Sequence, residues 1–117
     1  MPSVFKAWVD QISIPGRTTH VYPDGAPATG RRAVVISARG GSYGPGTPND
    51  GQDHLRPTLE LAAGPRTLGL DITGYITPEW TLAPVTPQFV DYIPKHEESL
   101  AAAHAAAREL GAALSAH

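Results

Sequence analysis

The fold of this chain is decided at residues 31–51, which read RRAVVISARGGSYGPGTPNDG. The apolar, β-branched run at residues 33–36 is too short for a helix and does not alternate with polar residues, which is typical of a parallel strand covered on both faces. A loop with five glycines, residues 39–51, follows at once. Because ligands of open α/β sheets bind at the carboxyl ends of the strands, this loop is a candidate ligand site; the alternative is a merely flexible connection.

Upstream of this strand, the sequence predicts a core-facing helix that begins almost at residue 1 and ends before Pro15-Gly16. Pro2 suits a position in its first turn. Its apolar residues recur at helical spacing on one face: Val4, Phe5, Trp8, Val9 and Ile12. The polar residues 17–32 predict a loop with one short strand around residues 20–22.

Downstream of the glycine-rich loop, we expect a short helix that contains Leu55 and Leu59, starts near Pro57 and stops at Gly64-Pro65. Residues 68–76 predict a second parallel strand, and the proline-rich residues 78–94 an irregular connection. A final helix starts at Pro94, with two glutamates near its positive end. Its apolar stripe comprises Leu100, Ala103, Ala107, Leu110 and Leu114.

The order of these elements predicts an α/β fold with a parallel sheet, in a single domain over residues 1–117. Two parallel strands alone do not make a stable covered sheet. We therefore expect either that a partner completes the sheet or that the fold is less regular than the order of elements suggests.

Composition narrows the function classes. The chain has no cysteine, which excludes disulfides, thiolate metal sites and cysteine nucleophiles. Its nine basic and eleven acidic residues give a net charge of −2, so no general field favours nucleic acid or a membrane surface. The sequence has no apolar run long enough for a membrane span and opens with no signal-peptide pattern. We expect a soluble, cytoplasmic, globular protein.

Four segments together resemble the FMN-dependent NADH-azoreductases, which belong to the flavodoxin-like NAD(P)H:quinone oxidoreductases. They are VFKAWVD at residues 4–10, ARGGSYGPG at 38–46, LGLDI at 68–72 and the alanine-rich final helix. The resemblance covers nearly all 117 residues and corresponds to the C-terminal portion of family members, in which a serine-rich phosphate loop and a second ring-gripping loop come earlier. It implies a flavodoxin-like parallel-sheet half, a partial three-layer α/β/α sandwich, and usually a dimer.

The resemblance also implies a function. In the family, FMN accepts hydride from NADH or NADPH and passes electrons to azo or quinone acceptors. Because the cofactor carries this chemistry, we expect no catalytic side-chain acid, base or nucleophile. Carried over by the motif, the cofactor-binding residues are Ser37, Ala38, Arg39, Gly40, Gly41 and Tyr43. Ala38 stands where the family has a serine, so only its backbone could bind the ring, and Gly64-Pro65 interrupts a helix that the family continues.

Other interpretations of the sequence stay open. The chain could be a non-catalytic truncated relative that acts as an interaction or structural subunit, in a homodimer or with a complementing chain. Arg31-Arg32 and Arg17 could attract the phosphates of a nicotinamide cofactor or simply cap a strand. The adjacent Asp53 and His54 lack a third ligand at useful spacing, so we expect no metal site.

Overall fold

The computed structural model describes residues 1–20 and 23–116, so that part of the short strand expected around residues 20–22 lies outside the described residues. The described chain divides into two compact units. The first comprises Met1–Ala33 and His54–Thr73, and the second comprises Val34–Asp53 and Gly74–His117. Both strands begin in the first unit and end in the second.

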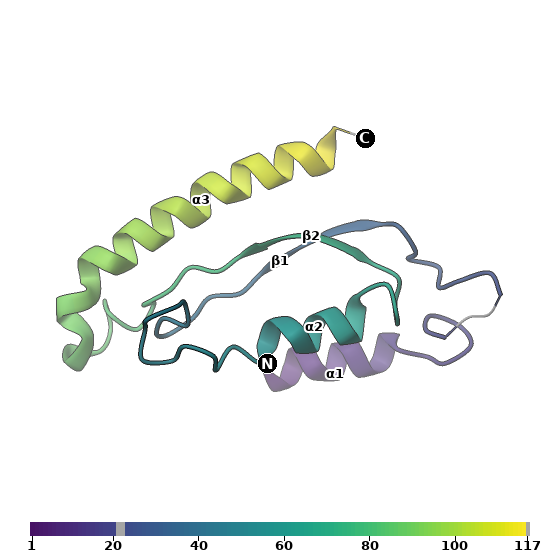
Figure 1. Cartoon of the computed structure of the whole chain (residues 1–117), viewed down its shortest axis with the longest axis horizontal. Coiled ribbons are helices and arrows are strands. Elements are labelled where there is room, and N and C mark those ends of the chain that lie inside the picture. The colour runs from purple at the N-terminus through teal and green to yellow at the C-terminus, as the bar shows by residue number, and fades with distance from the viewer. Residues whose placement is uncertain (21–22, 117) are drawn as a thin grey trace. The chain divides into compact units, whose positions relative to one another are not determined.

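A parallel pair of strands, β1 (Arg32–Ile36) and β2 (Asp71–Ile76), forms the sheet of the described chain (Figure 1). The N–H of Asp71 donates to the carbonyl of Arg31 (3.0 Å), and the N–H of Ser37 donates to the carbonyl of Ile76 (2.9 Å). Residue numbers therefore rise in the same direction along both strands. The α/β class with parallel strands is confirmed.

The expected cover on both faces of the first strand is wrong for the described chain. The side chain of Ile36 is 70% exposed, and the other residues of β1 are half-buried. The second strand also begins later than expected, at Asp71, because Gly69 turns the chain with a φ of +86°.

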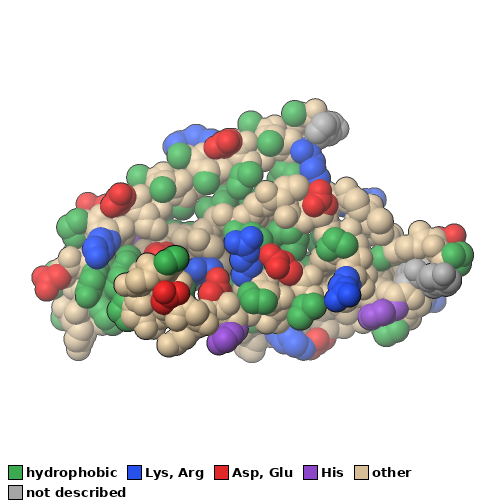
Figure 2. Space-filling model, viewed as in Figure 1, with side chains coloured by type: hydrophobic (Ala, Val, Ile, Leu, Met, Phe, Trp, Pro, Cys, Tyr) green, Lys and Arg blue, Asp and Glu red, His purple; other side chains and the backbone are tan. Residues whose placement is uncertain are grey.

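The first unit holds two helices, α1 (Ser3–Ile12) and α2 (Leu55–Ala63). The extent of α1 agrees with the prediction, but its apolar stripe is not wholly core-facing. Val9 is buried, whereas Val4 is 81% and Trp8 is 54% exposed. The buried apolar residues of this unit are Val9, Leu59 and Leu68, a core too small to cover the whole stripe. Hydrophobic side chains are accordingly visible among charged ones in Figure 2.

The helix α2 begins at Leu55, two residues before the expected start near Pro57. Proline is tolerated there because N–H groups of a first helical turn have no acceptor within the helix. The end of α2 before Gly64-Pro65 agrees with the prediction, and the N–H of Gly64 closes it on the carbonyl of Glu60 (3.1 Å).

The second unit contains a short 3-10 helix, η1 (Pro87–Tyr92), and the long helix α3 (Ile93–Ser115). The 3-10 helix lies inside the stretch expected to be irregular, whereas α3 begins within one residue of the expected Pro94. No residue in the described part of α3 is fully buried, but Leu110 packs so closely on β2 that a Cβ added to Gly74 would lie 2.7 Å from its Cδ1. Among the described residues, no helix is long and apolar enough to cross a membrane.

Candidate functional site

The glycine loop, residues 39–51, leaves the carboxyl end of β1 and is fastened to the segment that follows β2. The N–H of Arg39 donates to the carbonyl of Pro78 (2.8 Å), and the N–H of Thr81 donates back to the carbonyl of Arg39 (3.0 Å). The N–H of Trp80 donates to the carbonyl of Gly41 (3.2 Å). The beginning of the loop is therefore held where both strands end, the position at which α/β sheets bind ligands.

The glycine loop is also fixed from within. Ser42 is buried, and its carbonyl accepts hydrogen bonds from the Thr47 hydroxyl (3.0 Å) and the Asn49 side-chain amide (3.1 Å). Further along, the N–H of Gly46 donates to the Asp50 carboxylate (3.0 Å). These contacts give the loop a defined conformation, which a merely flexible connection would lack.

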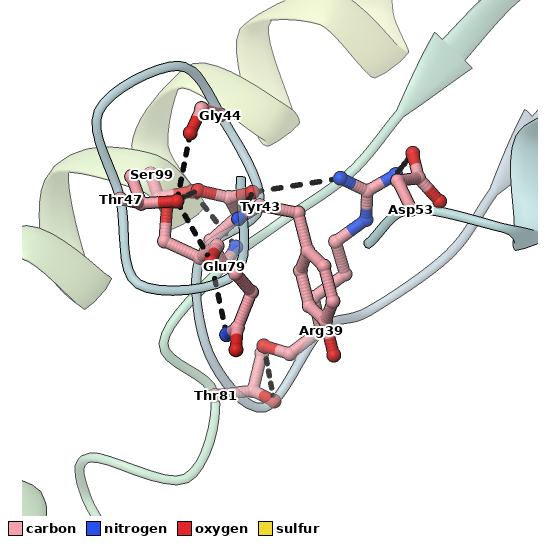
Figure 3. A network of polar contacts seen from close by, with 10 residues as sticks. Arg39, Tyr43, Gly44, Thr47, Asp53, Glu79, Thr81 and Ser99 are labelled. Carbon is pink, nitrogen blue, oxygen red and sulfur yellow. Dashed lines mark hydrogen bonds and ion pairs between the residues drawn. The ribbon is translucent and has the colours of Figure 1, made fainter. Parts of the chain in front are cut away.

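Arg39 lies between two carboxylates (Figure 3). Its Nη2 donates to Asp53 Oδ2 at 2.6 Å, and its Nη1 lies 3.5 Å from Glu79 Oε1. The arginine side chain is only 15% exposed, and the Tyr43 ring lies over it, with its centroid 5.4 Å from Cζ. A charge-assisted hydrogen bond to Asp53, an ion pair with Glu79 and a cation–π contact thus fix this guanidinium, and its charge is balanced within the protein.

Glu79 connects this ion network to the glycine loop. Its carboxylate accepts hydrogen bonds from the Ser42 hydroxyl and from the N–H of Tyr43, the latter at 3.1 Å. Its own N–H donates to Ser99 Oγ (2.9 Å), and its carbonyl lies 3.2 Å from His96 Nδ1. Since Ser99 and His96 belong to α3, the final helix positions the residue that holds the loop.

The residue after Glu79 has a strained backbone. Trp80 has a φ of +56°, a conformation that costs a non-glycine residue about 1–2 kcal/mol. Its indole stacks on the Tyr92 ring, with centroids 4.1 Å apart and planes 2° from parallel. Such strain persists only where the surrounding contacts fix it, and here it lets residues 78–82 turn along the start of the loop.

The backbone donors of the loop that have no acceptor in the described chain include those of the adjacent residues Gly40 and Gly41. A Cβ at Gly40 would lie 2.8 Å from Leu82 Cδ1, and a Cβ at Gly41 would lie 3.0 Å from the Asn49 amide nitrogen. A side chain at either position would therefore crowd Leu82 or Asn49, and the two glycines offer adjacent donors that suit carbonyl oxygens, ring nitrogens or anions.

The predicted site residues form a continuous backbone segment from Ser37 through Ala38 to Gly41, and the fold brings Tyr43 over Arg39. Arg39 points at Asp53 and Glu79, so its charge is paired within the protein itself. No local pattern in the sequence links Asp53, Glu79 or Thr81 to the loop. The position of Glu79 directly after the second strand's carboxyl end was the one signal in the sequence that could have found it.

Asp53, one of the two adjacent residues considered for a metal site, is paired with Arg39. The described residues include no group of three or more histidine or acidic side chains placed to hold a metal ion.

Comparison with known proteins places these features in a family. The model of a family with a flavodoxin-like fold matches residues 1–110. A protein of Frankia casuarinae named FMN-dependent NADH:quinone oxidoreductase is 47% identical over 110 residues, covering 92% of this chain and 50% of the relative. Proteins with the same name from Frankia alni (43% identical, covering 97% of this chain and 53% of the relative) and Streptomyces coelicolor (40% identical, covering 92% and 46%) also match.

The chain spans about half the length of the curated relatives it matches. The matched residues 1–110 include both strands, the glycine loop and most of α3. Because the chain has an α/β fold with parallel strands and matches the family model over residues 1–110, it belongs to the family with the flavodoxin-like fold.

Proposed function

We propose that this chain provides a flavin-binding part of an FMN-dependent NADH:quinone oxidoreductase. The observation that carries the proposal is the ordered glycine loop, which has unused N–H donors at Gly40 and Gly41 at the carboxyl end of β1. The names of the relatives, which match over 92% or more of the chain in the three cases above, support the same cofactor and electron donor.

The residues present fit the isoalloxazine ring of FMN. This ring is flat and has carbonyl oxygens and ring nitrogens along its edge, and those atoms accept hydrogen bonds from donors such as the N–H groups of Gly40 and Gly41. The absence of a side chain at either glycine lets the ring come close to the backbone. The Tyr43 ring would cover the site, while Ser37 and Ala38 would contribute backbone groups.

The chemistry of FMN determines which tasks fall to the cofactor and which fall to the chain. FMN, when bound, supplies hydride acceptance and electron transfer. The chain binds and orients the ring, and its fixed hydrogen-bond donors and charges influence how easily the ring is reduced. Arg39 acts mainly by holding the loop, because its charge is already balanced by Asp53 and Glu79.

The acceptor is proposed to be a quinone, with azo compounds as a second class that takes electrons by the same route. NADH is the proposed donor, with NADPH as an alternative. A homodimer, or a complementing subunit that adds binding elements, completes the proposal. The cytoplasmic location and the single domain over residues 1–117 stay predictions.

Titration of the 117-residue chain with FMN tests this function. We expect saturable quenching of flavin fluorescence and a change in the visible spectrum. A Gly41→Val variant, whose side chain would meet the Asn49 amide and fill the space beside the donors, should weaken binding at least about tenfold. Gly111→Ala is the matched control, because a Cβ there meets nothing within 4 Å.

Assays of NADH oxidation with 1,4-benzoquinone and with an azo dye would then follow on the FMN-loaded chain. Quinone-dependent oxidation supports the proposed reaction, and azo-dependent oxidation supports the broader acceptor range. A wild-type chain that leaves FMN fluorescence unchanged at high micromolar concentration would contradict the proposed function for this chain.

The second candidate is a non-catalytic interaction or structural subunit. It is favoured by the apolar residues of α1 that the described chain leaves uncovered, above all Val4 and Trp8. A chain that associates stably with itself but does not bind FMN would support this alternative.

A further inference from the structure

We infer that Glu79 is the positioning residue of the glycine loop: its carboxylate fixes the loop so that the N–H groups of Gly40 and Gly41 face a ligand. The inference rests on the proposed function for the identity of that ligand, FMN. The anchoring itself concerns contacts within this chain, so it can be tested separately.

The geometry places three kinds of donor on one carboxylate. The Ser42 hydroxyl and the Tyr43 N–H bind it from the loop, and the Arg39 guanidinium approaches it from the start of the loop (Figure 3). Gly40 and Gly41, whose N–H groups have no acceptor within the described chain, lie between these contacts in the sequence. A single side chain thus holds the loop on both sides of the proposed ligand donors.

Burial strengthens these bonds. The Glu79 side chain is 22% exposed, and Ser42 is buried. Hydrogen bonds to an ionised carboxylate are about twice as strong as neutral ones, and their loss leaves a partly buried hydroxyl and N–H without an acceptor. The anchor is itself rigid, because Ser99 of α3 accepts the backbone N–H of Glu79.

Charge gives Glu79 a second effect on the site. Arg39 carries one positive charge, and Asp53 and Glu79 carry one negative charge each, so the three side chains have a net charge of −1. Replacement by glutamine would make this net charge zero while keeping the size of the side chain. An aspartate at the same place would keep the charge but would be one methylene shorter.

Amide hydrogen exchange, followed by NMR on the FMN-free chain, tests the anchoring. In Glu79→Gln we expect the Tyr43 amide to exchange about tenfold faster or more, because its acceptor is weakened, with amides of β1 and β2 unchanged. Glu109→Gln, the same change at an exposed position of α3, should behave like the wild type. Glu79→Asp should lie between the two.

An unchanged Tyr43 amide in Glu79→Gln, or equal acceleration of all amides, overturns the inference. If Glu79→Gln does not fold, Ser42→Ala makes the same comparison, since it removes one of the loop's hydrogen bonds to the carboxylate. An unchanged Tyr43 amide there would also count against the inference.

FMN binding then tests the consequence for the ligand. We expect Glu79→Gln to bind FMN about tenfold more weakly than Glu109→Gln, and to shift the reduction potential of bound FMN upward, because one negative charge near the ring is gone. Equal affinities and potentials overturn the positioning role. If even the wild type does not bind FMN, the proposed function and the positioning of its ligand fail together, while the Tyr43 amide still decides whether Glu79 anchors the loop.

Discussion

Trp80 shows how a single residue combines strain and stabilisation. Its left-handed backbone is unfavourable for any residue with a Cβ, and its parallel stack on Tyr92 contributes about 0.5–1.5 kcal/mol beyond burial. Trp80 also donates its N–H to the carbonyl of Gly41. The balance between strain and stacking at Trp80 therefore affects how firmly the start of the glycine loop is held.

Two substitutions at Trp80 separate these effects. Trp80→Ala loses the stack and keeps the strain, so we expect the free energy of unfolding to fall by about 1–2 kcal/mol. Trp80→Gly loses the stack but relieves the strain, and it should be about 1 kcal/mol more stable than the alanine variant. Urea denaturation measures both values. Val85 is the control position, because it is largely exposed and has no positive φ. There the alanine variant should be at least as stable as the glycine variant. An alanine variant of Trp80 that is at least as stable as the glycine variant would contradict the assignment of strain.

At this scale, the sequence predicted the contiguous half of the candidate site and missed its partners. Arg39, Gly40 and Gly41 are adjacent in a recognisable motif, so one short pattern identifies all three. Glu79 lies 36 residues from Tyr43, and Asp53 lies 14 residues from Arg39. Only the folded chain brings such residues together, because no local spacing rule links a loop to the segment after another strand.

Among the elements, α3 and β2 meet at Gly74, where an added side chain would crowd Leu110. The side chain of Leu110 occupies the space above Gly74, and a Cβ there would lie 2.7 Å from Cδ1 and 3.1 Å from Cδ2. Both methyl groups of the leucine would have to move, which requires a shift of the side chain or of the helix.

We therefore expect Gly74→Ala to lower the free energy of unfolding by about 1–3 kcal/mol, the usual cost of overpacking. Gly111→Ala, one residue after Leu110 and in open space, should instead raise it by about 0.5–1 kcal/mol, because alanine is the better helix former. Urea denaturation of the two variants gives the comparison. Equal effects of the two changes would show that α3 does not pack on β2 at Gly74.

The elements were predicted better in kind than in extent. Three helices and two parallel strands occur in the predicted order, because each has a clear apolar pattern. Proline misled the prediction of the start of α2, since Pro57 is compatible with the first turn as well as with the first position. The 3-10 helix η1 was missed because a six-residue segment beginning with proline carries no apolar periodicity.

For the molecule as a whole, the order of elements predicted the α/β class, but the amount of buried surface did not follow from it. A strand with an unalternated apolar run such as residues 33–36 is usually covered on both faces, yet Ile36 is largely exposed in the described chain. Burial depends on how many strands and helices surround an element, which the pattern within that element does not record.

The uncovered apolar residues of α1 lead us to expect self-association. Light scattering after gel filtration should give the wild type a mass above the 12.3 kDa of one chain. Trp8→Glu places a charge on this surface and should shift the mass toward that of a monomer. Val90→Glu, at an exposed apolar residue of η1, is the control and should leave the mass unchanged. A wild type that is monomeric at every concentration would exclude the homodimer.

The central claim is that the glycine loop binds FMN through the N–H groups of Gly40 and Gly41. The most direct measurement is an NMR titration of the isotopically labelled 117-residue chain with FMN, following every backbone amide. We predict that the Gly40 and Gly41 amides shift most and exchange more slowly with solvent as FMN is added, because they gain acceptors. FMN that leaves the amides of residues 37–43 unchanged, or that shifts only amides elsewhere in the chain, would contradict the account.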